Sequence, residues 1–325
     1  MIFKSAESFF FEIGIELIKG ENSKYYPMSL QASCVSTLLT YEAKRLGVEF
    51  VFNSEIEFIK KKKNSFYIGT KAYDKVLIAT GSIATYSLGG SNLGYKIAKN
   101  FNHTIIKPIP SLVQLISNAP FLKKIAGVKL NATVKILVDK KLKATSNGDL
   151  LFTNYGLSGL AILDVSRVVS VALEKKRVVE ANLDLFPNFT KEQLTSLLQK
   201  RLKYENKKDI DLWLEGLINK KLIKIIIKES KIDKTFAKDL SKKDLNILAY
   251  TLKNFIFKIA DTKGFKSCEV VAGGVDTKEI NPKTMESKLV KNLFFCGEVL
   301  DVDGDRGGYN LHFAWASGYI AGCTM

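Results

Sequence analysis

The C-terminal stretch of the chain constrains its fold most strongly. A short apolar run, Leu293 to Cys296, predicts a buried strand, and a loop rich in glycine and acidic residues, 297–308, follows it directly. Tyr309 to Gly322 then predicts a helix. Ligands of open α/β sheets bind just beyond the carboxyl ends of the strands. The sequence therefore predicts an α/β fold with a ligand site where this strand ends.

The residue types after this strand favour a flat, hydroxyl-bearing ligand. Glu298 and Asp301 offer carboxylates that can accept hydrogen bonds from ribityl or ribose hydroxyls, and Gly307 and Gly308 allow the backbone to approach a ring closely. The helix that begins near Asn310 directs its N–H groups and positive dipole end outward. These features suit a flavin, whose reduced ring carries negative charge near N1 and O2.

A calcium-binding loop is the competing interpretation of the same residues. Asp301, Asp303 and Asp305 alternate as in an EF-hand, but the twelfth position of such a loop is His312 instead of a bidentate glutamate. The four cysteines and two histidines show no metal-ligand spacing. We therefore expect no metal site. Small residues at Ala314, Gly318 and Gly322 predict one helix face that packs closely on a sheet.

The first hundred residues contain the later elements of a dinucleotide-binding fold. Leu30–Leu46 predicts an amphipathic helix, Val48–Phe52 a strand, and residues 55–70 an antiparallel ribbon. Lys75 to Ala79 predicts a buried parallel strand that runs into Thr80 and Gly81. Such folds open with a strand, a glycine-rich turn and a helix, yet no GxGxxG-like turn precedes Leu30. Either the start is divergent or the sequence begins after it.

Two changes of texture divide the remainder. Residues 101–189 predict a β-rich insertion with one helix, and 190–261 predict a lysine-rich helical insertion. In the helical part we expect helices over Lys191–Leu202, Asp209–Lys228 and Lys242–Ile256, the last one capped by Ser241 with Asp244. Residues 1–100 and 262–325 would then form the dinucleotide-binding domain.

The net charge of +16 raises the question of a nucleic-acid partner. The excess is almost wholly lysine, which is spread along the chain, whereas base and phosphate recognition favours arginine. We therefore favour a solvated basic surface over a nucleic-acid patch. We expect a cytosolic protein without membrane spans, because the N-terminus lacks the pattern of a signal peptide and no long uncharged apolar run occurs. His103 is expected in a surface loop.

At this point the chain resembles a family, the bacterial FAD-dependent oxidoreductases known as aminoacetone-oxidase-like flavoproteins, whose relatives include a reductase of dehydro-bile acids. The resemblance covers essentially the whole chain. Besides the C-terminal stretch, it is carried by Tyr26–Ser29, Leu77–Gly81, Leu151–Gly159, Ala272–Val275 and Asn281–Ser287. It implies a Rossmann-like FAD/NAD(P)-binding α/β domain with an inserted β-barrel-like subdomain and an inserted helical subdomain.

Carried over position by position, the resemblance implies these cofactor-binding residues: Ile56, Thr80, Gly81, Gly273, Gly274, Gly297, Glu298, Asp301, Gly307, Gly308, Tyr309 and Asn310. Ile56 would meet the adenine, the 297–301 segment the ribityl and phosphate region, and the 307–310 segment the isoalloxazine ring. The family's opening glycine-rich FAD phosphate loop is missing from this sequence.

The resemblance implies an FAD-dependent oxidoreductase that acts on a small organic substrate, with NAD(P)H as a candidate electron donor. The sequence singles out no catalytic acid or base and gives no oligomeric state. Two alternatives remain open. The first is a truncated, cofactor-less remnant of the family, and the second, less favoured, is a basic nucleic-acid-binding protein.

Overall fold

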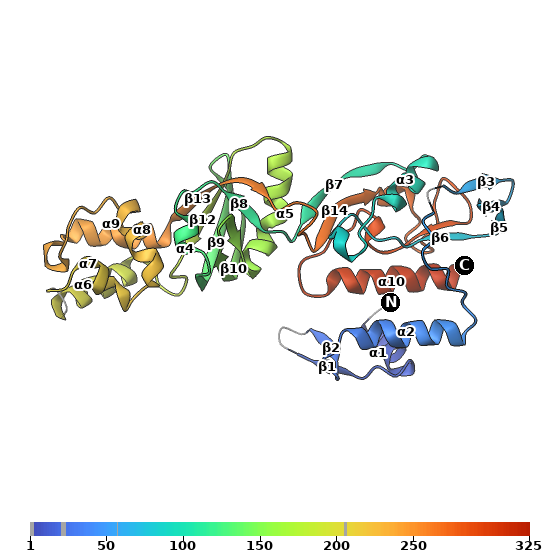
Figure 1. Cartoon of the computed structure of the whole chain (residues 1–325), viewed down its shortest axis with the longest axis horizontal. Coiled ribbons are helices and arrows are strands. Elements are labelled where there is room, and N and C mark those ends of the chain that lie inside the picture. Colours follow the sequence, from blue (N-terminus) through green and yellow to red (C-terminus); the bar gives the residue numbers. More distant parts are fainter. Residues whose placement is uncertain (1–2, 21–23, 57, 205–206) are drawn as a thin grey trace. The chain divides into compact units, whose positions relative to one another are not determined.

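A computed structural model describes residues 3–20, 24–56, 58–204 and 207–325 of the chain. These residues form two compact units (Figure 1). The first combines Met1–Pro108 with Val270–Met325, and the second is Ile109–Glu269. The boundaries differ from the expected ones at residues 101 and 262, because the strand that closes the second unit runs beyond residue 261.

The first unit is built on two parallel strands. β6 (Val76–Ile78) pairs with β15 (Leu293–Phe295), with Val76 opposite Leu293. Both strands are apolar, and Ile78, Leu293 and Phe295 lie in one buried core, as expected for strands covered on both faces. After β15 the chain makes a short turn and enters α10 (Tyr309–Thr324). The parallel pair and its following helix confirm the α/β fold that the sequence predicts.

Smaller elements surround this pair. An antiparallel meander, a short helix and a second strand pair complete the part of the first unit that carries the core. Their bounds are Lys60–Lys62 for β3, Ser65–Ile68 for β4, Lys71–Tyr73 for β5, Leu93–Asn100 for α3, Ile105–Ser111 for β7 and Val270–Val275 for β14. Single 3₁₀ turns are formed by Tyr86–Leu88 (η2), Thr277–Glu279 (η4) and Gly297–Val299 (η5).

The N-terminal part of this unit consists of α1 (Phe3–Glu12), the hairpin of β1 (Leu17–Lys19) and β2 (Tyr25–Pro27), and α2 (Ser33–Arg45). None of the residues of α2 is buried. The strand predicted over Val48–Phe52 is wrong, since this segment has no regular secondary structure. The physical reason is the lack of a partner: a strand needs a neighbour for its N–H and C=O groups, and no described strand pairs with this segment.

The second unit contains a closed six-stranded antiparallel barrel with the strand order β10-β11-β8-β13-β12-β9, so the implied barrel-like insertion is confirmed. The helices α5 (Leu160–Glu174) and α4 (Leu122–Ile125) belong to the same unit. The strands are Leu115–Ser117 (β8), Lys129–Val138 (β9), Lys141–Phe152 (β10), Gly156–Ser158 (β11), Val179–Asp184 (β12) and Phe255–Thr262 (β13). The tight β9–β10 turn has positive φ at both Asp139 and Lys140, which matches the twist of a hairpin.

Four helices interrupt the barrel between β12 and β13: α6 (Lys191–Tyr204), α7 (Ile210–Glu215), α8 (Lys220–Glu229) and α9 (Lys242–Lys253). The single helix predicted over Asp209–Lys228 is wrong. It breaks after Glu215, and Asn219 caps a new helix by accepting a hydrogen bond from Lys221 N–H. The capping box of Ser241 and Asp244 is confirmed. The last helix ends at Lys253 rather than Ile256, because Phe255 and Ile256 pair with β12.

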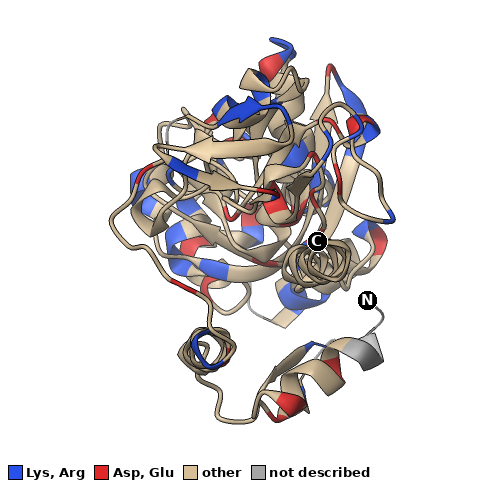
Figure 2. Cartoon of the chain, turned by 90° about the vertical axis from the view of Figure 1, so that its right-hand side faces the viewer, with Lys and Arg blue, Asp and Glu red and all other residues tan. Residues whose placement is uncertain are grey.

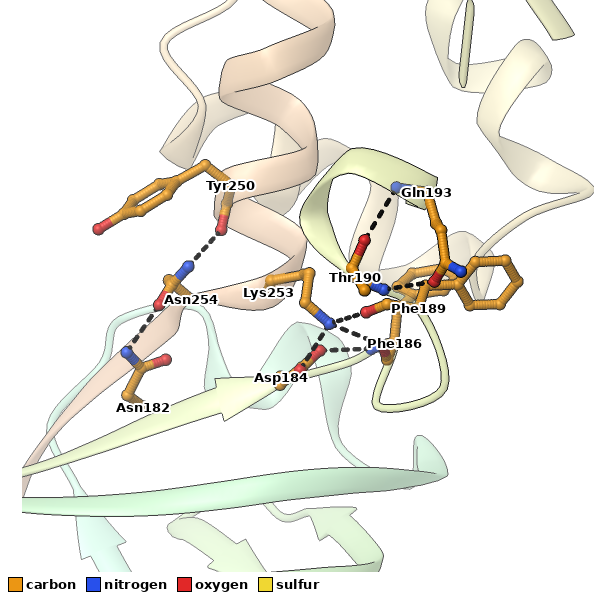
Figure 3. Close-up of polar contacts among 9 residues, drawn as sticks. All are labelled: Asn182, Asp184, Phe186, Phe189, Thr190, Gln193, Tyr250, Lys253 and Asn254. Atoms are coloured by element: carbon orange, nitrogen blue, oxygen red, sulfur yellow. Dashed lines mark hydrogen bonds and ion pairs between the residues drawn. The ribbon is translucent and has the colours of Figure 1, made fainter. Parts of the chain in front are cut away.

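A buried ion pair joins the end of α9 to the end of β12 (Figure 3). The ammonium of Lys253 donates to Asp184 Oδ2 at 2.7 Å and to Phe186 O at 2.9 Å, and it also donates to Phe189 O. Both ionic side chains are largely buried, with 15% and 12% of their surface exposed. Their contacts fix the place where the chain leaves the barrel and later returns to it.

Candidate functional site

The loops after β6 and β15 leave the sheet side by side. Cys296 N–H donates to Ile78 O at 3.1 Å, so the parallel pairing continues to the last residue before Gly297. Beyond it, Glu298 Oε1 accepts a hydrogen bond from Val271 N–H at 2.8 Å, and the side chain of Ser82 also hydrogen-bonds to Glu298. The acidic side chain predicted to meet a ligand therefore ties together three segments that are far apart in the sequence.

The ionisation of Glu298 is set mainly by its burial. Removal from water raises the pKa of this carboxyl above the ordinary glutamate value, and the negative charge of Asp303 acts in the same direction. The hydrogen bonds from Val271 and Ser82 lower the pKa and oppose part of this shift. Burial prevails, so the site holds a carboxyl group that takes up a proton more readily than a surface glutamate does.

Gly273 and Gly274 in β14 lie where two backbones come very close. A Cβ atom on Gly273 would lie 2.5 Å from Lys107 O, and one on Gly274 would lie 2.6 Å from Val299 O. Both have positive φ, at 102° and 140°. Asp301 N–H donates to Val275 O at 2.9 Å just beyond this contact. The glycines therefore permit β14 to pack against β7 on one side and the 297–301 segment on the other.

Helix α10 is attached to the start of this segment through a serine. Gly297 has a φ of 71°, and its N–H donates to the Oγ of buried Ser317 at 2.9 Å. The buried face of α10 is formed by Ser317 and Ala321. The expected packing of Gly318 and Gly322 is wrong, because nothing lies within 4 Å of a Cβ built on either. The helix is rotated so that the serine, not the glycine stripe, faces the sheet.

The loop before α10 is closed by Asn310. Its side-chain Oδ1 accepts from Gly304 N–H at 2.8 Å, and its Nδ2 donates to Gly304 O at 3.0 Å. The Asn310 amide thus shapes the loop. Gly308 forms the N-terminal cap of the helix with a φ of 97°, and a Cβ on Gly308 would meet no atom within 4 Å. Tyr309, the first residue of the helix, is 65% exposed.

The remaining predicted residues have separate surroundings. Gly81 has a φ of 68° and open space where a Cβ would be, whereas Thr80 Oγ1 would lie 2.1 Å from a Cβ on Gly94 at the start of α3. Gly307 lies near Lys24, with 3.7 Å between its Cβ position and Lys24 Cε. Ile56 packs against the core of the first unit. The structure thus brings residues 80–82, 273–274 and 297–301 together at the carboxyl ends of the strands.

The sequence interpretation missed a buried polar group in the same unit. His103, expected at the surface, is 3% exposed. Its Nδ1 lies 2.9 Å from Glu279 Oε2 and its Nε2 lies 2.9 Å from Ser287 Oγ. Burial lowers the pKa of His103, although the adjacent carboxylate raises it in part. The partners lie about 180 residues further along the chain, so no local pattern could have revealed the contact.

The geometry fits the flavin end of FAD better than its diphosphate end. Gly81 and Gly308 combine positive φ with free space, which is what a backbone that lies against a flat ring requires. The N-terminus of α10 begins at the same loop. A diphosphate is held by a glycine-rich turn and a helix N-terminus after the first strand of such a fold, and the sequence has no such turn before Leu30. Among the described residues, no cluster of His, Cys, Asp and Glu is arranged for a metal ion.

Comparison with known proteins places the whole chain in context. A family model described as "HI0933-like protein Rossmann domain" matches residues 3–324. The 3-dehydro-bile acid delta(4,6)-reductase of Clostridium scindens is 34% identical over 320 residues, which is 97% of this chain and 78% of the reductase. The ribosomal RNA dihydrouridine synthase of Haemophilus influenzae is 31% identical over 304 residues, 90% of this chain and 73% of the synthase.

The ribosomal RNA dihydrouridine synthase of Escherichia coli is also similar, with 30% identity over 292 residues, 89% of this chain and 70% of the synthase. Among the helices that the structure describes, none has the length and apolar character needed for a membrane span.

Proposed function

Because the chain belongs to the family of HI0933-like proteins with a Rossmann domain, we propose that it is an FAD-dependent reductase that adds hydrogen to a carbon–carbon double bond conjugated with a carbonyl group. The names of two relatives support this substrate class. A 3-dehydro steroid with unsaturation at positions 4 and 6 and the uracil ring of uridine both carry such a bond. In each case the named activity or product is a reduction.

The observation that carries the proposal is the meeting of the 80–82, 273–274 and 297–301 segments beside the N-terminus of α10. Bound FAD would supply hydride transfer, since hydride chemistry belongs to the cofactor. Gly81 and Gly308 would allow the backbone to lie against the ring, with Gly307 and Tyr309 beside them. The positive end of α10 would favour negative charge on the pyrimidine side of the ring.

Glu298 would act on the site through its neighbours. Its carboxyl holds Val271 and Ser82 in place, and the second carboxyl of the segment, that of Asp301, is the better candidate for a ribityl hydroxyl. Ile56, Thr80, Gly273, Gly274 and Asn310 would shape the walls of the site, by packing or by closing loops.

The direct test is to purify the protein, add FAD and record the absorbance spectrum. A flavin spectrum that stays with the protein on gel filtration, and that bleaches anaerobically with NADH or NADPH, is the expected outcome. Comparison of the two donors identifies the nicotinamide cofactor. A protein that neither retains nor takes up FAD would refute the proposal for this chain.

A ribosomal RNA substrate is the second candidate, and the net charge of +16 favours it. Lysines and arginines lie on many elements of the chain, with acidic residues among them (Figure 2). A basic surface of this kind attracts a polyanion without selecting a sequence. The discriminating assay offers the reduced flavoprotein a 3-keto-4-ene steroid and unmodified ribosomal RNA in parallel. Mass spectrometry then shows which product has gained two hydrogen atoms.

A further inference from the structure

One face of the first unit leaves groups exposed that sheets normally cover. β6 is bonded to β15 through Val76 and Ile78, since Val76 N–H donates to Asn292 O and Ile78 O accepts from Cys296 N–H. In a parallel pair alternate residues face each neighbour, so the N–H and C=O of Leu77 point to the opposite edge of β6. No described strand pairs with that edge.

The segment after α2 has the sequence of a strand but lacks the partner of one. Val48, Phe50, Val51 and Phe52 are 52%, 38%, 66% and 70% exposed. The rings of Phe50 and Phe52 stack with their centroids 5.8 Å apart, as residues two apart do on one face of an extended chain. We name the edge of β6 together with residues 48–52 the open face.

The neighbouring helices are also covered incompletely. α2 contains no buried residue, and α10 buries Ser317 and Ala321 only, although both helices carry apolar side chains. An exposed strand edge with exposed apolar side chains beside it is a template for the addition of another strand. One inserted strand can pair with the β6 edge on one side and with residues 48–52 on the other, and a helix that follows it can cover α10 or α2.

We propose that the open face is the docking site of a polypeptide segment that folds as a strand, a glycine-rich turn and a helix and that lies outside residues 1–325. The relatives contain enough additional chain for such a segment, since the match spans 78% of the bile-acid reductase and 73% and 70% of the two synthases. A strand, turn and helix need roughly 30 residues with the following strand. The inference concerns association and goes beyond the proposed reaction.

Addition of this segment also supplies what the site lacks. A glycine-rich turn directly after the inserted strand lies at the carboxyl ends of the parallel strands, where the 80–82 and 297–301 loops already meet. The helix after the turn then presents its N-terminus to an anionic group. The docked segment is therefore expected to raise the affinity of the chain for FAD, whose diphosphate needs these donors.

The test supplies the segment as a defined polypeptide. Residues 1–325 are mixed with the portion of the Clostridium scindens reductase that lies outside the match, and in parallel that portion is fused ahead of Met1, which raises its effective concentration. We expect a one-to-one complex on gel filtration and slower amide hydrogen exchange at residues 48–52 and Leu77. These readouts need neither FAD nor turnover, so their failure is distinct from failure of the proposed reaction.

Two matched variants make the test specific. Val51→Lys places a charge on the open face, whereas Val178→Lys changes a valine of similar exposure, 63%, in the second unit. We expect Val51→Lys to weaken the complex at least tenfold and Val178→Lys to leave it unchanged, with circular dichroism showing that both variants are folded. Equal effects of the two variants would overturn the proposal. So would unchanged exchange at residues 48–52 in both the mixture and the fusion. Self-association of residues 1–325 that Val51→Lys abolishes would assign the face to a second copy instead.

Discussion

Replacement of Glu298 tests how the site is held together. In Glu298→Ala the N–H of Val271 loses its acceptor at 2.8 Å, and Ser82 loses a partner. An unsatisfied buried N–H costs about 1–3 kcal/mol, and a lost neutral hydrogen bond a further ~1 kcal/mol. We therefore expect the free energy of unfolding of the first unit to fall by about 2–4 kcal/mol. Glu298→Gln keeps an oxygen for Val271 and removes the cost of a buried charge, so its change should stay within ~1 kcal/mol.

The assay is urea unfolding followed by tryptophan fluorescence. The two tryptophans lie in different units, Trp213 in α7 and Trp315 in α10, so a Trp213→Phe background reports on the first unit alone. Glu55→Ala, an exposed glutamate of the same unit, is the matched control and should change the stability by no more than about 0.5 kcal/mol.

The pH dependence gives a second readout. Because burial raises the pKa of Glu298 in the folded state, its contribution to stability is present below the ordinary glutamate value of 4.5 and is lost as the pH rises through the folded value. Glu298→Gln has no such group, so its stability relative to the wild type should increase as the pH rises across this window. Equal stabilities of Glu298→Ala and Glu298→Gln at all pH values would refute the bracing role of the carboxyl.

Three further predictions concern packing and charge. Gly274→Ala should cost roughly 2–5 kcal/mol, because its Cβ would lie 2.6 Å from Val299 O and its φ is 140°, and thermal unfolding should show this loss. Lys253→Met should lower the free energy of unfolding of the second unit by about 3–5 kcal/mol by leaving Asp184 buried without its cation (Figure 3), and adding Asp184→Asn should restore part of the loss. The lowered pKa of His103 means that its contribution to stability is present above the ordinary value of 6.5 and is lost as the pH falls through the folded value. His103→Gln should remove that pH dependence, which denaturant titrations at several pH values would detect.

Local signals in the sequence determined most of the elements. Apolar runs such as Leu77–Ile78 and Leu293–Phe295 predict buried parallel strands because both of their faces must leave water, and these strands are confirmed. The cap of α9 is likewise a local matter, since Ser241 and Asp244 satisfy each other's backbone N–H groups within one turn. The resemblance of the C-terminal stretch to a flavoprotein family rests on the same local order of strand, loop and helix, and the chain does belong to a Rossmann-domain family.

Long-range partners were decided by the tertiary structure alone. Val48–Phe52 has the composition of a strand, but strand formation depends on a neighbour that residues 1–325 do not place beside it. Phe255–Thr262 continues a helical pattern in the sequence, yet it closes the barrel because β12 and β8 both need a partner at that position. The acidic residue chosen for its chemistry, Glu298, turns out to hold Val271, and that contact joins residues 27 positions apart. The reason is physical: capping and periodicity act within a few residues, whereas hydrogen-bond partners and buried faces are supplied by segments that only folding brings together.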